Sequence, residues 1–237
     1  MKKLRFLVLL TLLAACTPQE LQNALGTLTG SGQLTSAEIG SGLKQALEFG
    51  ISEGAQKLAE KDGYFKSQYK ILLPAEARKV TDKLQNIPGF SDIENVILEK
   101  INRGAEDAAK KAAPIFVDAI KAMTFQDALG ILMGENNAAT TYLNNATYQP
   151  LYDEFSPVII ESLDKFNARQ YWSDAVNTYN KIPFIEKVNP DLGDYVTGEA
   201  LNGLFSMVEK KELEIRNNVN ARTTDLLKKV FAKQDNK

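Results

Sequence analysis

The sequence predicts an all-α protein, and three observations support this fold class. Apolar residues recur at helical spacing, as in the run Ile39, Leu43, Leu47, Ile51 and Leu58. Capping boxes, in which Ser or Thr is followed three residues later by Glu, open two such runs, at residues 35–38 and 91–94. The sequence contains no alternating strand pattern and no hairpin dipeptide between strands. Unequal helices interrupted by proline favour an irregular multi-helix bundle with Pro-kinked helices.

The first third of this bundle is expected to hold two helices joined by an extended connector. The first helix should follow the N-cap Thr35 and end near Asp62 and Gly63, because glycine suits a left-handed helix cap. Residues 69–73 form the connector. Pro74 then opens a helix through about residue 84, since proline is accepted in a first helical turn. The Ile-Pro-Gly sequence at 87–89 interrupts it.

The middle third is expected to hold three helices. The capping box at 91–94 begins a helix that runs to about residue 113, and Pro114 starts or kinks the next turn. Thr124 begins another helix, which ends near Gly134. Residues 137–143 form a short separate helix.

The last third is expected to hold a long helix, a loop and two further helices. Apolar spacing predicts a helix over 148–179 with a kink or restart at Pro157. Residues 182–190 are expected to form a loop. Thr197 caps the following helix, and residues 222–233 form the last one.

The N-terminus is typical of an exported bacterial lipoprotein. Residues 1–15 combine a short basic head with the apolar run 6–13, which is a secretory signal and too short to span a membrane. Residues 13–16, Leu-Ala-Ala-Cys, resemble the lipobox. That resemblance implies cleavage before Cys16, a diacylglycerol thioether on its sulfur and a further acyl chain such as palmitate. Several acyl chains together give stable anchoring.

The mature chain is then expected to have three parts. Residues 16–34, rich in Thr, Gln, Gly and Ser, form the lipidated N-terminus and a flexible tether that spans on the order of 20–25 Å. Residues 35–233 form a single helical domain, and residues 234–237 fray. By resemblance to proteobacterial sorting, a residue other than Asp at Thr17 implies an outer-membrane location, facing the periplasm or the surface.

Charge and composition exclude several function classes. Removal of residues 1–15 leaves 25 basic and 30 acidic residues, a formal charge of −5, which gives no general attraction for nucleic acid. The chain has no histidine and one cysteine. A Ser–His–Asp triad, a Cys–His dyad, Cys/His zinc sites and an internal disulfide are therefore impossible. No metal, no cofactor and no catalytic residue is expected.

Two small groups of residues are candidates for binding. Ala46, Gly50 and Gly54 lie four apart on one helical face, where glycine is unfavourable unless another helix or a ligand comes close. Arg216 and Arg222 flank an Asn-rich turn. An arginine at such a turn binds internal carbonyl or carboxylate groups, or else an anionic headgroup.

The whole mature chain resembles a bacterial family known only as a domain of unknown function, DUF4197. The stretches that carry the resemblance are, in order, GLKQAL at 42–47, DGYF at 62–65, MTFQDA at 123–128, ILMG at 131–134, AATTYL at 138–143, YVT at 195–197 and RTTDLL at 222–227. The resemblance implies a helical, exported, often lipid-anchored protein. It supplies no activity and no catalytic residues.

Three hypotheses for function remain open from the sequence. The first is a non-enzymatic binding or scaffold module of the cell envelope, with an envelope protein as partner. The second is a carrier for an acyl chain or another hydrophobic ligand, held in a cavity near Gly50 and Gly54. The third is a hydrolase of envelope polymer, which needs an Asp/Glu pair about 5–9.5 Å apart in a cleft.

Overall fold

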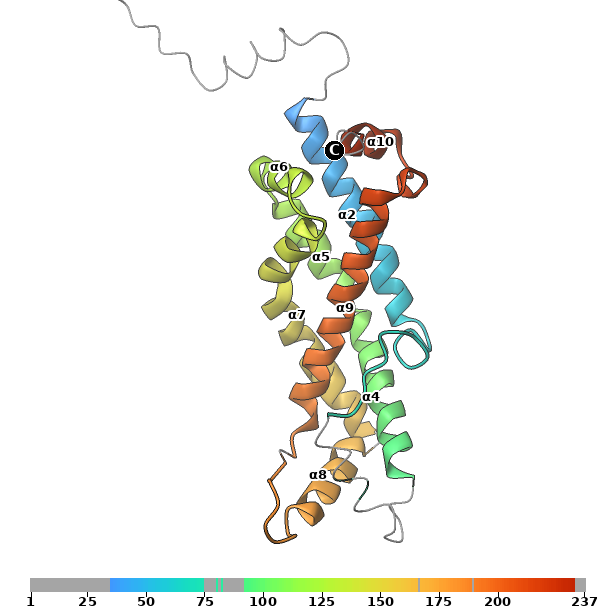
Figure 1. Cartoon of the computed structure of the whole chain (residues 1–237), viewed down its shortest axis with the longest axis vertical. Helices are drawn as coiled ribbons and strands as arrows, with labels where there is room; N and C mark the ends of the chain where they lie inside the picture. Colours follow the sequence, from blue (N-terminus) through green and yellow to red (C-terminus); the bar gives the residue numbers. More distant parts are fainter. Residues whose placement is uncertain are drawn as a thin grey trace, which may run out of the picture. The chain divides into compact units, whose positions relative to one another are not determined.

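The computed structural model describes residues 35–74, 80, 82, 92–165, 167–188 and 190–232. Every regular element among them is helical, and no strand occurs in these ranges (Figure 1). The all-α prediction is confirmed. The described helices belong to one unit, residues 36–237. The predicted signal peptide, Cys16 and the predicted tether lie outside the described residues.

Helix α2 (Ser36–Ala59) packs against α4, α5, α6, α9 and α10. The apolar stripe predicted for it is buried: Ile39, Leu43, Leu47, Ile51 and Leu58. The chain then turns through Asp62, which has a φ of 71° and is the residue in the left-handed region. The prediction that Gly63 adopts the left-handed conformation of a helix cap was therefore wrong. Gly63 is needed for a different reason, because a Cβ there would lie 2.4 Å from the carbonyl oxygen of Lys57.

Helix α4 (Ile93–Ala109) begins one residue later than the predicted capping box implied. Its N-cap residue is Asp92, which makes no side-chain capping bond, and Ser91 lies outside the described residues. Helix α5 (Ala112–Ala122) has Pro114 in its first turn, as the sequence suggested. The helix predicted from Pro74 and the break at 87–89 fall mostly on undescribed residues.

Helix α6 (Phe125–Met133) confirms a predicted element at both ends. The Thr124 side chain accepts a hydrogen bond from the backbone N–H of Asp127. The Asp127 carboxylate accepts one from the backbone N–H of Thr124 in return. Gly134 is the C-cap residue. Both signals are local, because residues three apart supply all the partners.

Helix α7 (Ala138–Lys165) is one continuous helix where two were predicted, and it contains Pro150 and Pro157. Each proline removes the backbone bond to the carbonyl four residues earlier. Those carbonyls belong to exposed residues, Ala146 and Asp153, which solvent can hydrate. The buried positions of α7 meanwhile recur at helical spacing: Leu143, Thr147, Leu151, Phe155, Ile159 and Leu163.

The prediction of one helix over 148–179 was also wrong in its second half, because the helix is interrupted at Asn167. This residue has a φ of 54°, in the left-handed region that Asn adopts more easily than most residues. Helix α8 (Ala168–Tyr179) follows it. Helix α8 is therefore a separate element that packs on α4 and α7.

Helix α9 (Leu192–Asn217) is capped by Asp191, whose carboxylate accepts a hydrogen bond from the N–H of Gly193. The predicted cap Thr197 lies inside the helix, buried, and its hydroxyl donates to the carbonyl of Gly193. After a 3-10 turn at Val219–Ala221, α10 (Asp225–Phe231) is capped by Thr224. The last helix is thus shorter than predicted.

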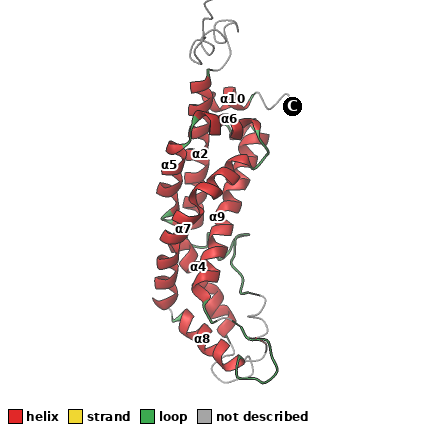
Figure 2. Ribbon diagram, turned by 90° about the vertical axis from the view of Figure 1, so that its left-hand side faces the viewer, coloured by secondary structure: helices red, strands yellow, loops and turns green. Residues whose placement is uncertain are grey.

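The long helices α2, α4, α7 and α9 pack side by side and place different elements at the two ends of the unit (Figure 2). One end carries α6, α10 and the start of α2. The other end carries α8 and the loop that joins it to α9, as both ribbon views show.

Candidate functional site

The predicted residue Arg216 is part of a buried ion pair. Its Nη2 and Nε atoms donate to Oε1 of Glu212 at 2.7 and 2.9 Å. Its Nη2 also donates to the carbonyl oxygen of Ile131 at 2.8 Å, in the last turn of α6. A guanidinium at this position compensates the negative end of the α6 dipole.

Glu212 binds the start of the next helix. Its Oε1 accepts from the backbone N–H of Ala139 at 2.9 Å, and its Oε2 accepts from the backbone N–H of Thr140 at 2.8 Å. The hydroxyl of Thr140 donates to the same Oε2 at 2.8 Å. The pair Glu212–Arg216 therefore connects the end of α6 to the start of α7, with each charge at the helix end that favours it.

Arg222 is 1% exposed and closes the end of α9. Its Nε donates to the carbonyl of Ile215 at 3.0 Å, and its Nη2 donates to the carbonyl of Arg216 at 2.9 Å. The guanidinium also lies over the ring of Phe231, 5.6 Å from its centroid. Both predicted arginines therefore bind internal groups in this structure, one of the two roles the sequence left open.

The predicted glycines Gly50 and Gly54 face α9. A Cβ on Gly54 would lie 2.9 Å from Cγ of Met207, and one on Gly50 would lie 3.4 Å from Cδ1 of Ile215. Side chains of α9 thus fill the space beside both glycines. The glycines allow the close approach of two helices, which was one of the two predicted reasons for them.

A second polar cluster, which the sequence did not reveal, docks the turn after α2 onto α4. Glu106, 5% exposed, accepts from the backbone N–H groups of Tyr64 and Phe65 at 3.2 and 3.1 Å. Arg103 pairs with Glu106 at 2.7 Å and with Asp62 at 2.8 Å. The hydrogen bond from Arg103 lowers the pKa of Asp62 from its ordinary value of 3.8, and Glu106 raises the pKa of Arg103.

Two further contacts hold the same turn and connector. The hydroxyl of buried Tyr64 donates to the carbonyl of Ala200 in α9 at 2.7 Å, and burial raises the pKa of that phenol. Fully buried Asn102 accepts from the N–H of Ile71 at 2.8 Å and donates to its carbonyl at 2.9 Å. An isolated Asn on a helix has no distinctive sequence signal, because only the folded chain brings Ile71 to it.

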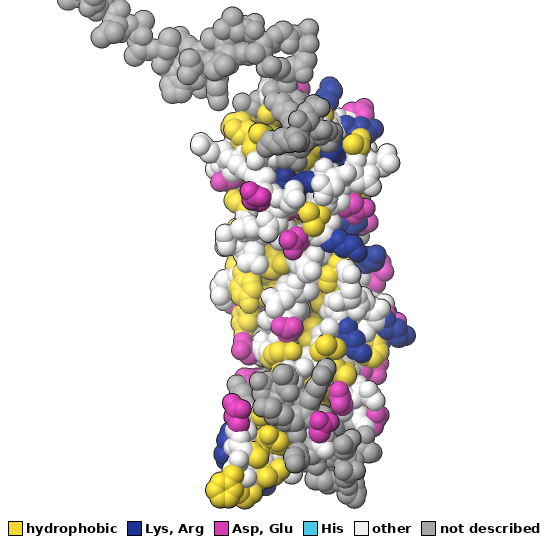
Figure 3. Space-filling model, in the orientation of Figure 1, with side chains coloured by type: hydrophobic (Ala, Val, Ile, Leu, Met, Phe, Trp, Pro, Cys, Tyr) yellow, Lys and Arg dark blue, Asp and Glu magenta, His cyan; other side chains and the backbone are white. Residues whose placement is uncertain are grey.

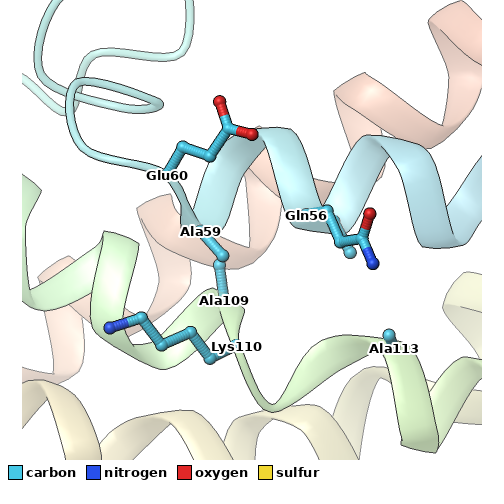
Figure 4. Close-up of a pocket in the computed structure, with 7 residues that line it drawn as sticks. Gln56, Ala59, Glu60, Ala109, Lys110 and Ala113 are labelled. Carbon is cyan, nitrogen blue, oxygen red and sulfur yellow. The ribbon is translucent and has the colours of Figure 1, made fainter.

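A shallow hollow of about 400 Å³ lies between the end of α2 and the α4–α5 junction (Figure 4). Small side chains form its floor: Ala55, Ala59, Ala109 and Ala113. Gln56, Glu60 and Lys110 lie at its rim, and their polar ends point away from one another (Figure 4). Ligand sites combine an apolar wall with convergent polar groups. This hollow has no such convergence.

The most unusual exposed residue is Phe184, in the loop between α8 and α9. Its relative exposure is 107%, and its φ is 62°, in the left-handed region. Ile182, in the same loop, and Tyr171 of α8 are also exposed. Figure 3 shows hydrophobic side chains gathered at this end of the unit. An aromatic residue with positive φ is a genuine backbone outlier, and such strain clusters at binding and switch regions.

Side-chain bonds close this loop at its base. Asn180 accepts from the N–H of Val188 at 3.0 Å and donates to the carbonyl of the same residue at 3.0 Å. Lys187 donates to the carbonyl of Asn180 at 3.1 Å. We call residues 180–188 the distal loop. Its base is held while its apolar tip projects into solvent, so the tip is presented in an ordered form.

The sequence predicted a loop at residues 182–190 and assigned it no binding role. A signal was nevertheless present, since residues 182–185 are four consecutive apolar or proline residues in a segment predicted to be a surface loop. Among the described residues, no three His, Cys, Asp or Glu side chains are grouped to hold a metal ion. None of the described helices has the length and apolar character needed to cross a bilayer.

The fold and these clusters define an all-α helical bundle whose helix ends are held by buried charged and polar side chains. Residues 33–232 match the family model described as Protein of unknown function (DUF4197). The chain belongs to this family, as the resemblance indicated. No curated protein matches the chain, and no solved structure matches it.

Proposed function

We propose that this protein is a lipid-anchored, non-enzymatic binding module of the bacterial cell envelope, which presents the distal loop to a protein partner. The observation that carries the proposal is Phe184, a fully exposed aromatic side chain on a strained backbone. Natural proteins rarely retain such strain together with an exposed large apolar group unless the region is used.

The shape of the tip indicates the kind of partner. Sites for small molecules are concave and bury most of the ligand. The side chain of Phe184 instead projects from the surface and is fully exposed, so the partner protein must supply the pocket. Aromatic anchors that enter such pockets dominate the energetics of protein interfaces. The bonds between Asn180 and Val188 hold the base of the loop, which lowers the entropy lost on binding.

The anchor is supported by the sequence of residues 1–16, in which the single cysteine occupies the lipobox position. Labelled palmitate is expected to enter the wild-type protein and not Cys16→Ser. The membrane fraction should contain the wild-type protein after a high-salt wash, because the acyl chains hold it independently of charge. Release of the wild-type protein by salt would contradict the anchor.

Site-specific crosslinking tests the partner. A photoreactive phenylalanine analogue placed at Lys181, in the distal loop, should form one discrete protein adduct in cells of the source bacterium. Phe184→Ala, added to this variant, should reduce the adduct by about tenfold or more, as expected for the loss of a buried aromatic anchor. Phe49→Ala is the matched control, since Phe49 is also exposed (53%) but lies on α2. An adduct that survives Phe184→Ala would overturn the proposal.

A further inference from the structure

Helix α6 has two apolar faces, although it lies at the surface. Its inner face is buried in the bundle through Ala128, Ile131 and Leu132. Its outer face exposes Phe125, Leu129 and Met133, at 37%, 40% and 47%. These three residues follow one another at intervals of four and so share one side of the helix. We call them the outer face of α6.

Nothing charged interrupts this face. The only ionisable residue of α6 is Asp127, and its carboxylate is committed to the capping box with Thr124. Gly130 is exposed beside the outer face, and a Cβ there would meet no atom within 4 Å. A surface helix ordinarily opposes a polar face to its apolar one. The outer face of α6 is therefore apolar and uncharged, as is typical of a surface that is buried in a contact.

The position of α6 indicates what covers it. Phe125 lies against the first turns of α2, where a Cβ on Gly40 would be 3.7 Å from its ring. The chain enters α2 at Ser36, so the segment that follows Cys16 joins the bundle at the end occupied by α6 (Figure 1). If the proposed tether between Cys16 and Ser36 behaves as a random coil, it spans about 25 Å. A lipid on Cys16 would thus keep this end within reach of the bilayer.

We propose that the outer face of α6 lies in the bilayer interface as a second membrane contact beside the lipid. This inference rests on the anchor proposed at Cys16. A short helix with three partly exposed apolar side chains binds a membrane weakly by itself, but a tether raises its effective concentration at the surface. The contact would direct the distal loop away from the membrane, since that loop lies at the opposite end of the unit (Figures 1 and 2).

Tryptophan quenching tests the contact with the full, lipidated protein. The chain has a single tryptophan, Trp172, which is 1% exposed and lies in α8. The wild-type protein, reconstituted in vesicles of phosphatidylethanolamine and phosphatidylglycerol with brominated acyl chains, therefore supplies the baseline. Leu129→Trp places a second indole on the outer face of α6. Its emission should be quenched about twofold more than that of the wild-type protein, because interfacial helices bury their apolar face among the acyl chains.

Two further variants separate the possible causes of quenching. Phe184→Trp is the matched control, with an exposed indole at the opposite end, and it should stay at the baseline. Met133→Asp, added to Leu129→Trp, should restore the emission, because a carboxylate on this face opposes burial in lipid. Equal emission from Leu129→Trp and Phe184→Trp would overturn the inference. A concentration-dependent blue shift without bromine quenching would overturn it in favour of a second copy of the chain.

Palmitate incorporation in the same preparations reports the anchor separately. Incorporation without quenching at residue 129 would refute the α6 contact and leave the anchor intact. Quenching in protein that carries no palmitate would support the contact and refute the anchor. The absence of both would refute both.

Discussion

The Nη2 atom of Arg222 donates to the backbone carbonyl of Arg216 at 2.9 Å, so the two arginines belong to one buried network. The network continues from Arg216 through Glu212 to the first N–H groups of α7. It joins the ends of three helices in one place. The sequence left two roles open for these arginines, internal partners or an anionic headgroup, and in the structure both find their partners within the chain.

The first prediction concerns the buried ion pair. Glu212→Gln is expected to lower the free energy of unfolding by about 3–5 kcal/mol, because it leaves the charge of Arg216 buried without its counter-ion. Glu53→Gln is the matched control. It removes a partly exposed pair between Glu53 of α2 and Lys211 of α9, and pairs near the surface contribute about 1 kcal/mol or less. Urea denaturation of both variants measures the difference, and equal losses would show that Glu212–Arg216 is not stabilising.

The second prediction concerns Asn102. Asn102→Ala should destabilise the protein by about 2–3 kcal/mol, because it leaves the buried N–H and carbonyl of Ile71 unpaired. Asn95→Ala, on the same helix, removes only an exposed bond to Asp92 and should change stability by less than about 0.5 kcal/mol. Hydrogen exchange at Ile71 should accelerate in Asn102→Ala alone. Unchanged exchange there would exclude the role given to Asn102.

The third prediction concerns acid stability. The pKa of Asp62 is lowered in the folded protein by its hydrogen bond to Arg103. A lowered folded-state pKa contributes stability above the unfolded-state value, and this contribution is lost as pH falls through the folded-state value. Asp62→Asn should therefore be less stable than the wild-type protein near neutral pH, and the two should converge below about pH 4. Asn accepts the left-handed φ of this position. Urea titrations across pH test this, and a gap that widens in acid would contradict it.

The fourth prediction concerns glycines in helices. Gly198→Ala should stabilise the protein by about 0.5–1 kcal/mol, because the new Cβ meets no atom within 4 Å. Gly54→Ala should be worse than Gly198→Ala by about 1 kcal/mol or more, since Cγ of Met207 would have to move. Thermal unfolding of the two variants measures the contrast. Equal stabilisation at both positions would mean that α2 and α9 are not closely packed at Gly54.

The fifth prediction separates function from stability in the distal loop. Phe184→Gly should raise the free energy of unfolding by up to about 1 kcal/mol, because glycine adopts positive φ without the steric penalty of a side chain. The same variant should lose the crosslinked adduct. If the variant is more stable and forms no crosslinked adduct, the strain at Phe184 serves binding. Destabilisation by Phe184→Gly would instead mean that the ring supports the fold.

Local sequence signals predicted those parts of the fold whose partners lie within one helical turn. The Thr124–Asp127 box and the buried stripe of α2 are examples, because three- and four-residue spacings place the groups together whatever surrounds them. The same logic failed at Thr197. There the competing local cap, Asp191, begins the helix, and packing buries Thr197 inside it.

By itself, the sequence determined the all-α class and the family, because periodicity and short motifs carry that information. Lipid attachment at Cys16 stays a prediction from the sequence. Only the tertiary structure decided that α7 continues through two prolines and that Arg216 is paired inside the chain. It alone showed that Phe184 and the outer face of α6 remain uncovered. Burial depends on which segments, distant in the sequence, come into contact in the folded chain. The local spacing of residues carries no information about those contacts.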